Sequence, residues 1–226
     1  HKSLDMEPAR EHRDAERERF SFFLGLPETD RTQVRLDQVK GVAQLQPLFE
    51  FSLACSGCGE TPYIKTLTQL FGDRMVIANA TGCSSIFGGN LPTTPYTKNA
   101  DGRGPAWSNS LFEDNAEFGL GMRLAADLHT ELARKRLAEL RGEIADDELV
   151  DGLLYGPQET MHELRIQYRH IQRLHERLDE LAGPLVDDLR SVADHLLRRS
   201  VWIIGGAGWA YDIGSAGPDH GLASGG

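Results

Sequence analysis

The sequence predicts an α/β fold, in which a partial parallel sheet is flanked by helices and carries a long helical insertion. Two short apolar runs, at residues 75–78 and 201–204, have the length and composition of buried strands. Each run leads into a turn that contains glycine, as strands do in α/β layers with a site at the strand ends. Between the two runs, apolar residues recur three and four apart among charged ones and predict amphipathic helices.

Three features precede the first predicted strand. Residues 1–19 are charged throughout and predict a solvated linker or a short helix. Residues 47–51 alternate in the manner of a strand. A helix is expected from residue 61 onward, because proline is favoured in the first turn. The predicted apolar face of this helix comprises Tyr63, Leu67, Leu70 and Phe71.

The segment between the two predicted strands divides into a long loop and a set of helices. Residues 87–113 show little periodicity, and a loop of this length in a compact domain is usually functional. The charged, amphipathic helices that follow predict an antiparallel insertion that serves as scaffold. They are expected over residues 115–141, 146–154, 158–181 and 184–199, the first with a stripe of Leu124, Leu128, Leu132 and Leu137.

The composition argues against several classes of protein. The chain has 226 residues, 40% of them hydrophobic, and a formal net charge of −10. The hydrophobic share supports a folded core, while the acidic balance argues against binding nucleic acid or an anionic membrane surface. No run of about 18 apolar residues occurs, so no membrane span is expected. Three cysteines do not suit a secreted disulfide framework, and we expect a reducing cytoplasm.

The three cysteines, Cys55, Cys58 and Cys83, all lie in turns that contain glycine. Their spacing leaves open a structural zinc site, a thioredoxin-like redox pair, three buried structural thiols or a [4Fe–4S] cluster. Zinc sites and [4Fe–4S] clusters usually take four protein ligands, and a redox pair would leave Cys83 unexplained. Glu60 places a carboxylate two residues after Cys58, which suggests a redox site beside an organic cofactor.

A second candidate site follows the predicted strand at residues 201–204. The glycine-rich run at 205–209 would let backbone N–H groups approach phosphates. A plain tight turn would show the same pattern, so this signal alone is weak.

Longer motifs connect these sites. They comprise residues 45–51 (LQPLFEF), 54–63 (ACSGCGETPY), 77–86 (IANATGCSSI), 88–96 (GGNLPTTPY) and 102–117 (GRGPAWSNSLFEDNAE). Together they closely resemble pyruvate:ferredoxin (flavodoxin) oxidoreductase of the long single-chain type. The resemblance extends from about residue 20 to residue 226 and includes the helical insertion.

The resemblance implies a thiamine diphosphate-binding fold and places the chain in the C-terminal domain of the enzyme. The family decarboxylates pyruvate on thiamine diphosphate, passes electrons through [4Fe–4S] clusters to ferredoxin or flavodoxin, and releases acetyl-CoA from coenzyme A. Mg²⁺ would anchor the diphosphate through oxygen ligands. Homodimers are usual in the family.

The family's site residues carry over to particular positions. Cys55, Cys58 and Cys83 match three ligands of the cluster nearest the thiamine. Glu60 matches an acid that contacts the cofactor, and Cys83 also lies against the cofactor. The diphosphate-binding turn corresponds to Gly206, Ala207, Gly208 and Trp209. The main catalytic groups are expected outside this chain.

The sequence also departs from the family pattern. Ala207 stands where the family has an aspartate that binds Mg²⁺, and alanine offers no side-chain oxygen. The fourth cluster cysteine, which the family places further C-terminal, is not among these residues. We therefore expect a fragment that is inactive by itself. The alternative is a truncated, non-catalytic remnant, and a cysteine-based zinc or interaction module is a weaker third reading.

The expected organisation has four parts. Residues 1–45 form a linker and lead-in, and residues 46–122 form the α/β region for thiamine diphosphate and the iron–sulfur cluster. Residues 123–200 form the helical insertion. Residues 201–226 return to the sheet and provide the diphosphate-binding turn, truncated after it.

Overall fold

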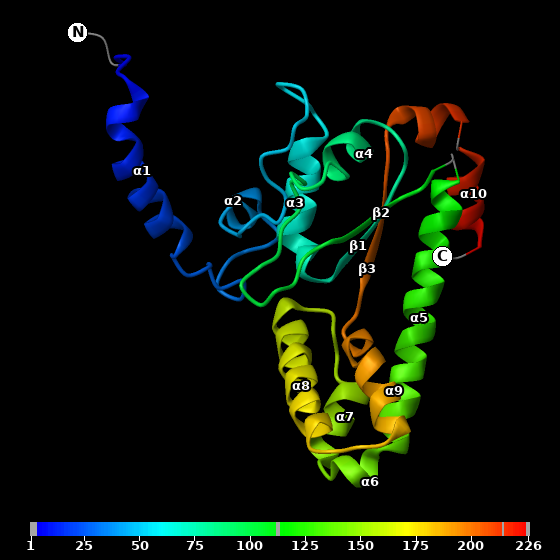
Figure 1. Ribbon diagram of the computed structural model, residues 1–226. Helices are drawn as coiled ribbons and strands as arrows, with labels where there is room; N and C mark the ends of the chain where they lie inside the picture. The colour runs from blue at the N-terminus through cyan, green and yellow to red at the C-terminus, as the bar shows by residue number, and fades with distance from the viewer. Residues whose placement is uncertain (1–3, 112–113, 214, 225–226) are drawn as a thin grey trace.

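A three-stranded parallel sheet lies at the centre of the chain (Figure 1). The computed structural model describes residues 4–111, 114–213 and 215–224. Its strands are β1 (Met75–Asn79), β2 (Ala106–Asn109) and β3 (Ser200–Ile204), in the order β2-β1-β3. Both pairings are parallel, and Ile77 at the centre of β1 lies opposite Trp107 and Trp202. The prediction of an α/β fold with a small parallel sheet is confirmed.

Helices α3 (Thr61–Phe71) and α5 (Asn115–Glu139) cover opposite faces of this sheet. Successive side chains of a strand point to opposite faces. On β3, the Trp202 ring packs against Phe71 of α3, with ring centroids 5.2 Å apart. The next residue, Ile203, packs so closely on α5 that a Cβ added at Gly119 would lie 2.4 Å from its Cγ1 atom.

The strand ends define two edges of the sheet. At the carboxyl edge lie α4 (Cys83–Gly88), the π-helical turn η3 (Gly208–Ile213) and α10 (Ala216–Ala223). At the amino edge, the 3₁₀ turn η1 (Gly72–Arg74) joins α3 to β1. We call the three strands, their two edges, α3, α4 and the first half of α5 the sheet layer.

Below the amino edge, the chain forms a compact helical region (Figure 1). This region consists of the second half of α5 with α6 (Arg141–Ile144), α7 (Asp147–Tyr155), α8 (Met161–Asp179), α9 (Pro184–Val192) and η2 (Ala193–Leu196). It holds one continuous core, whose fully buried members include Leu137, Leu149, Leu153, Ile171, Leu174 and Leu178.

Capping residues fix where the helices of this region begin. Thr160 and Glu163 form a capping box at α8, with the Thr160 hydroxyl accepting from the Glu163 N–H at 3.3 Å. Asp146 caps α7 by accepting from the Leu149 N–H at 3.1 Å. Pro184 occupies the first turn of α9.

The N-terminal segment stands apart from the rest of the chain. Helix α1 (Ala9–Leu24) has no buried residues and projects away from the sheet layer (Figure 1). A single turn, α2 (Val39–Val42), follows before the chain reaches the sheet layer. No helix of the described residues has the length and apolar character needed to cross a membrane.

Two predictions about strands were wrong. Residues 47–51 do not form a strand, and only an isolated antiparallel bridge joins Phe49 to Tyr96. Conversely, β2 lies inside the segment 87–113, for which no strand was predicted. Its sequence, Ala-Trp-Ser-Asn, has no apolar run, because this edge strand is only partly covered.

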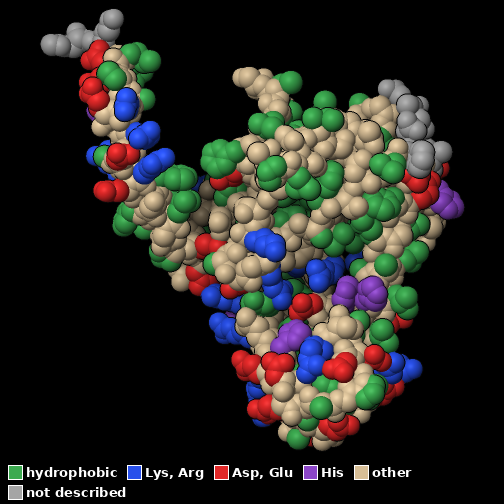
Figure 2. Space-filling model, in the orientation of Figure 1, with side chains coloured by type: hydrophobic (Ala, Val, Ile, Leu, Met, Phe, Trp, Pro, Cys, Tyr) green, Lys and Arg blue, Asp and Glu red, His purple; other side chains and the backbone are tan. Residues whose placement is uncertain are grey.

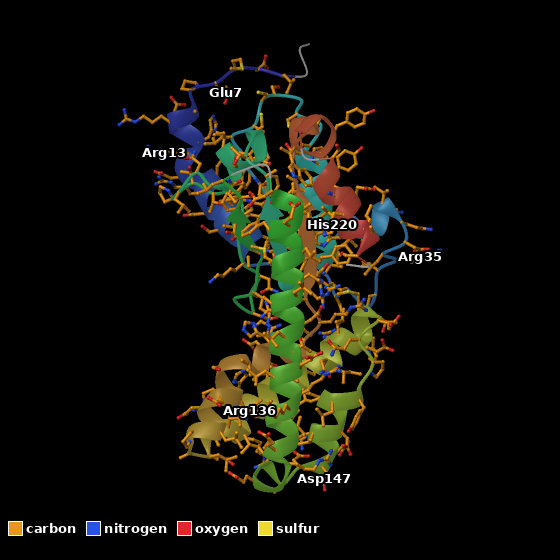
Figure 3. All side chains as sticks on the ribbon, turned by 90° about the vertical axis from the view of Figure 1, so that its right-hand side faces the viewer. Glu7, Arg13, Arg35, Arg136, Asp147 and His220 are labelled. Atoms are coloured by element: carbon orange, nitrogen blue, oxygen red, sulfur yellow. The ribbon has the colours of Figure 1, made fainter. Side chains whose placement is uncertain are left out.

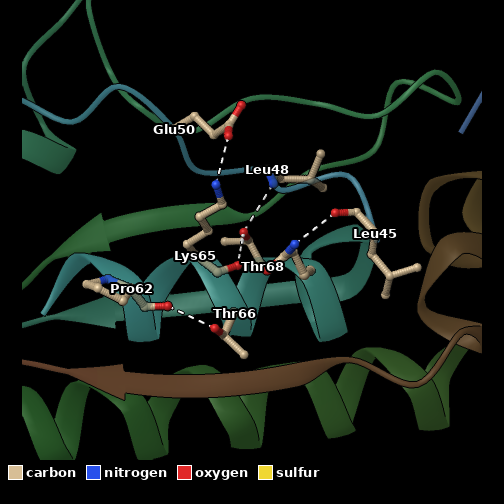
Figure 4. A network of polar contacts seen from close by, with 8 residues as sticks. Leu45, Leu48, Glu50, Pro62, Lys65, Thr66 and Thr68 are labelled. Atoms are coloured by element: carbon tan, nitrogen blue, oxygen red, sulfur yellow. Dashed lines mark hydrogen bonds and ion pairs between the residues drawn. The ribbon is translucent and has the colours of Figure 1, made fainter. Parts of the chain in front are cut away.

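The predicted apolar face of α3 was also wrong in part. Tyr63 is 76% exposed, whereas Ile64, Thr68 and Gln69 are buried. The polar members of that face are satisfied by backbone groups of the preceding segment (Figure 4): the Thr68 hydroxyl accepts from the Leu48 N–H at 3.1 Å, and the Gln69 amide donates to the Leu45 carbonyl at 2.8 Å. The buried face of α3 thus includes the polar residues Thr68 and Gln69, which a search for apolar residues at helical spacing does not find.

The leucine stripe of α5 divides between the two regions. Leu124 and Leu128 are 61% and 63% exposed, while Leu137 is fully buried in the helical region. Figure 3 shows α5 running the length of the molecule, from the sheet layer to Arg136 and the turn before Asp147. The helix therefore has no single buried stripe, because it packs on different partners at its two ends.

Candidate functional site

The first two cysteines lie in a tight turn at the start of α3. The Cys58 N–H donates to the Cys55 carbonyl at 3.0 Å, and Gly57 between them has a φ of +76°. This positive φ is easy for glycine and costly for a residue with a side chain. Helix α3 begins directly after this turn and ends at η1, which leads into β1, so the turn lies at the carboxyl edge of the sheet.

The third cysteine reaches the same edge from the other direction. Strand β1 ends at Asn79, and residues 80–82 lead into α4, of which Cys83 is the first residue. Cys55 and Cys83 are exposed, Cys58 is partly exposed, and all three are free thiols. The structure therefore brings the predicted cysteines to one edge of the sheet, on two separate loops.

The glycine-rich run follows β3 at this same edge. The Ala80 N–H donates to the Ile204 carbonyl at 2.7 Å, which joins the loop after β1 to the end of β3. A Cβ added at Gly205 would lie 2.7 Å from the Ala80 Cβ atom, so only glycine permits this approach. Beyond it, Gly206, Ala207 and Gly208 are exposed, and open space surrounds the two glycines on their side-chain side.

A network of buried amides supports the two loops from beneath. The Asn115 amide, fully buried, donates to the carbonyls of Ala78 and Ile204 at 3.1 and 3.3 Å, and so ties β1 to β3 where both strands end. The Asn79 amide donates to Asn109 Oδ1 at 2.9 Å, tying β1 to β2. The Thr81 hydroxyl accepts from the Asn109 amide at 3.1 Å.

Sequence reasoning assigned no role to these amides. Asn79 closes an apolar strand and Asn115 opens α5, and a polar residue at such a position is a signal that could have pointed to them. The Oδ1 atoms of Asn79 and Asn115 and the Nε1 atom of Trp209 are buried without a hydrogen-bond partner among the described residues. Buried polar groups are normally paired, so this edge of the sheet has unmet hydrogen-bonding capacity.

Glu60, the predicted cofactor contact, directly precedes α3, and its charge acts on the partly buried phenol of Tyr96. Burial raises the pKa of the Glu60 carboxyl above its ordinary value. Burial also raises the pKa of the Tyr96 hydroxyl, and the negative charge of Glu60 adds to that rise. The Tyr96 ring is held by Phe49, with ring centroids 5.0 Å apart. A partly buried carboxyl holds its proton more tightly than a solvated one.

The residues at the carboxyl edge suit an iron–sulfur cluster and a diphosphate better than they suit Mg²⁺. Three free thiols are the right donors for an iron–sulfur cluster, although no three His, Cys, Asp or Glu side chains of the described residues lie close enough to hold one metal ion. The open glycine turn suits a diphosphate. Ala207 provides no oxygen for Mg²⁺, so that part of the donor set does not fit.

Large apolar side chains are exposed in the segments that carry and follow the thiols. Phe51, at a φ of +57°, is 86% exposed, and Leu53, Ile86, Leu91 and Leu111 are also exposed. Figure 2 shows green side chains gathered over the sheet layer, in contrast to the mixed charges of the helical region. An apolar surface of this kind marks a place where further protein or a ligand packs.

Comparison with known proteins shows the same motifs over nearly the whole chain. No family model matches the chain. Pyruvate-flavodoxin oxidoreductase of Trichormus variabilis is 56% identical over 99% of the chain, and the probable pyruvate-flavodoxin oxidoreductase of Escherichia coli is 50% identical over 98%. Pyruvate:ferredoxin oxidoreductase of Moorella thermoacetica is 47% identical over 99%.

These relatives are much longer than the chain, which spans 18–20% of their length. Sequence identity at this level over nearly the whole chain indicates common descent. The chain is thus a homologue of one section of the single-chain pyruvate:ferredoxin (flavodoxin) oxidoreductases.

Proposed function

We propose that this chain forms the part of a pyruvate:ferredoxin (flavodoxin) oxidoreductase that holds thiamine diphosphate and the nearest [4Fe–4S] cluster. The observation that supports the proposal is that the loops bearing the free thiols of Cys55, Cys58 and Cys83 and the open glycine turn after β3 all lie at the carboxyl edge of the sheet. Ligands of parallel α/β sheets bind at that edge.

We extend the proposal to the activity of the longer protein, because its relatives are pyruvate oxidoreductases. The longer protein would oxidatively decarboxylate pyruvate with coenzyme A to acetyl-CoA and CO₂, and would pass electrons to ferredoxin or flavodoxin. Its remaining domains, and a second copy in a homodimer, would cover the exposed apolar surface around the thiols.

Each predicted site residue has a place in this proposal. Cys55, Cys58 and Cys83 would supply thiolates to the cluster. Glu60 would contact the organic cofactor and hold a proton at its carboxyl, consistent with its raised pKa. The backbone at Gly206, Ala207, Gly208 and Trp209 would approach the diphosphate. When bound, thiamine diphosphate supplies carbanion stabilisation and the cluster takes up electrons.

The second candidate is a non-catalytic remnant of the same domain, and Ala207 is the observation that favours it. Mg²⁺ requires hard oxygen ligands near the diphosphate, and this side chain has none. In this case the loops keep their fold without holding the metal.

Iron analysis separates the two candidates. The chain is purified without oxygen and assayed for iron and acid-labile sulfide, with EPR after dithionite reduction. We expect about four irons per chain, their loss in Cys58→Ser, and their retention in Ser56→Ala, an exposed neighbour in the same turn. A chain without iron, or with zinc in its place, would mean that the site needs the fourth cysteine further C-terminal, and would favour the second candidate for these residues.

The Mg²⁺ site is tested in the full-length protein. Ala207→Asp should tighten Mg²⁺-dependent binding of thiamine diphosphate by about tenfold or more, because it restores a carboxylate ligand. Titration calorimetry with and without Mg²⁺ measures this change. An unchanged dissociation constant would show that the turn after β3 does not hold the diphosphate.

A further inference from the structure

A cavity of about 250 Å³ lies where the amino edge of the sheet meets the helical region. Four arginines from four separate segments line it: Arg31 in the lead-in, Arg74 in η1, Arg103 in the loop before β2 and Arg165 in α8. These segments come together at the waist of the molecule (Figure 1), where basic side chains gather with acidic ones among them (Figure 2). We call this cavity the waist cavity.

The acidic side chains of the waist cavity are either paired or solvated. Asp30 accepts from the Thr32 N–H at 2.9 Å, the Thr32 hydroxyl at 2.8 Å and Arg165 at 2.9 Å, and these bonds lower its pKa to about 2. Asp73 pairs with Arg74 at 3.0 Å. Glu28 and Asp101 also line the cavity, but both are exposed to solvent.

Positive charge is in surplus around the carbonyl of Leu70. The guanidinium groups of Arg31 and Arg74 both approach this single acceptor, each at 3.5 Å. Arg74 is only 9% exposed, and its pKa is lowered mainly by burial, with Arg31 and Arg198 adding to the effect and Asp73 opposing it. Arg31 has no carboxylate within ion-pair distance among the residues that the structure describes.

Further donors complete the lining. The Arg103 guanidinium stacks on the Tyr168 ring, 3.8 Å from its centroid, and is 3.9 Å from Asp194. The Asn99 Oδ1 atom accepts from the N–H groups of Asp101 and Arg103, at 3.1 and 2.9 Å. Its two amide hydrogens have no acceptor among the described residues, and Asn99 lines the cavity.

From this arrangement we propose that the waist cavity binds the phosphate group of a small metabolite. Arginine forks match the paired oxygens of phosphate, and the phosphate would pair with Arg31, which has no carboxylate partner among the described residues, whereas Arg74 already pairs with Asp73. The chain as a whole carries a net charge of −10, so such a gathering of arginines is not a general property of its surface. The waist cavity lies at the amino edge, away from the thiols, so the ligand would connect the lead-in, the β2 loop and α8 without taking part in electron transfer.

Thermal unfolding with inorganic phosphate tests this proposal on the 226-residue chain. We expect 10 mM phosphate to raise the Tm by about 3–6 °C over sodium chloride of equal ionic strength, if the Kd is about 1 mM. Arg31→Gln should weaken phosphate binding about tenfold or more, because it removes the guanidinium that lacks a carboxylate partner. Arg17→Gln changes the net charge equally on the solvated helix α1 and should keep the effect.

Three outcomes would overturn the proposal. The first is an equal rise in Tm with chloride at the same ionic strength, which indicates general screening. The second is full retention of phosphate binding in Arg31→Gln. The third is a matching loss in Arg17→Gln, which would trace the effect to net charge. A ³¹P NMR titration reads binding without reference to stability, so a variant that unfolds early still gives an answer.

Discussion

The helical region and the sheet layer bury their side chains in very different ways. The helical region joins 17 buried hydrophobic residues in one continuous core, and side chains cap the starts of α7 and α8. Around the thiols, the buried cluster consists of Phe49, Ile64 and Phe87, while Phe51 and Leu53 stay exposed and buried amide oxygens lack partners among the described residues. The helical region therefore has one continuous apolar core, whereas the sheet layer leaves large apolar side chains exposed where further protein or a ligand can pack.

This difference teaches which part of the molecule carries function. A protein keeps unsatisfied groups and exposed apolar surface where something else binds. The helical region also has buried nitrogen atoms without a hydrogen-bond partner among the described residues, at Arg136, His170, Arg190 and His195, so the difference lies in its continuous apolar core and not in unmet hydrogen bonds. Its division from the rest at residues 123–200 remains a prediction.

The largest expected effect lies in the helical core. Leu174→Ala should lower the free energy of unfolding by about 2–5 kcal/mol, because it leaves a cavity among fully buried neighbours. Leu124→Ala, on an exposed position of α5, should change it by less than about 0.5 kcal/mol. Urea denaturation followed by circular dichroism measures both. Similar losses in the two variants would break the comparison, since they would mean that the helical core is no more tightly packed than the surface.

A smaller effect is expected from the amide network of the sheet layer. Asn115→Ala removes two hydrogen bonds to the carbonyls of Ala78 and Ile204 and should cost about 1–3 kcal/mol. Hydrogen exchange should show faster opening of β1 and β3, while the helical region stays protected. Asn90→Ala, at an exposed position in the loop after α4, is the matched control. Unchanged exchange in β1 would mean that Asn115 does not tie the two strands together.

The smallest effect concerns pH dependence at Glu60. Its pKa is raised in the folded chain, so the folded state holds the proton more tightly than the unfolded state does. The stability that this group contributes is present below the unfolded pKa of about 4.3, and is lost as pH rises through the folded pKa. Glu60→Gln should therefore lose less stability across that rise, as measured by Tm against pH. A profile that matches the unchanged chain, or an equal flattening in Glu131→Gln on α5, would contradict this account.

Local sequence patterns predicted most of the elements. The runs at 75–78 and 201–204 became β1 and β3, and each amphipathic segment of the insertion became a helix within a few residues of its expected bounds. These elements succeed because their periodicity reflects the burial of one face or of a whole strand. The failures share a cause too. Residues 47–51 alternate but pair only through Phe49, and β2 pairs without an apolar run, because strand pairing is decided by partners distant in sequence.

The residues of the candidate site were likewise predicted only in part from the sequence. The sequence identified the cysteines, Glu60 and the glycine turn, since their residue types and motif spacing carry the chemistry. It could not identify Asn79 or Asn115, because their hydrogen bonds depend on which strands are neighbours.

The sequence by itself determined the α/β character, the helical insertion and the residues that bear reactive side chains. The reason is physical: propensity, periodicity and donor chemistry are properties of the local chain. Only the tertiary structure decided that two cysteine loops and a glycine turn lie at the same edge of the sheet, and that four arginines from distant segments line a cavity at the other. Such meetings depend on the order β2-β1-β3 and on the packing of α8 beneath it, and packing is set by the whole chain at once.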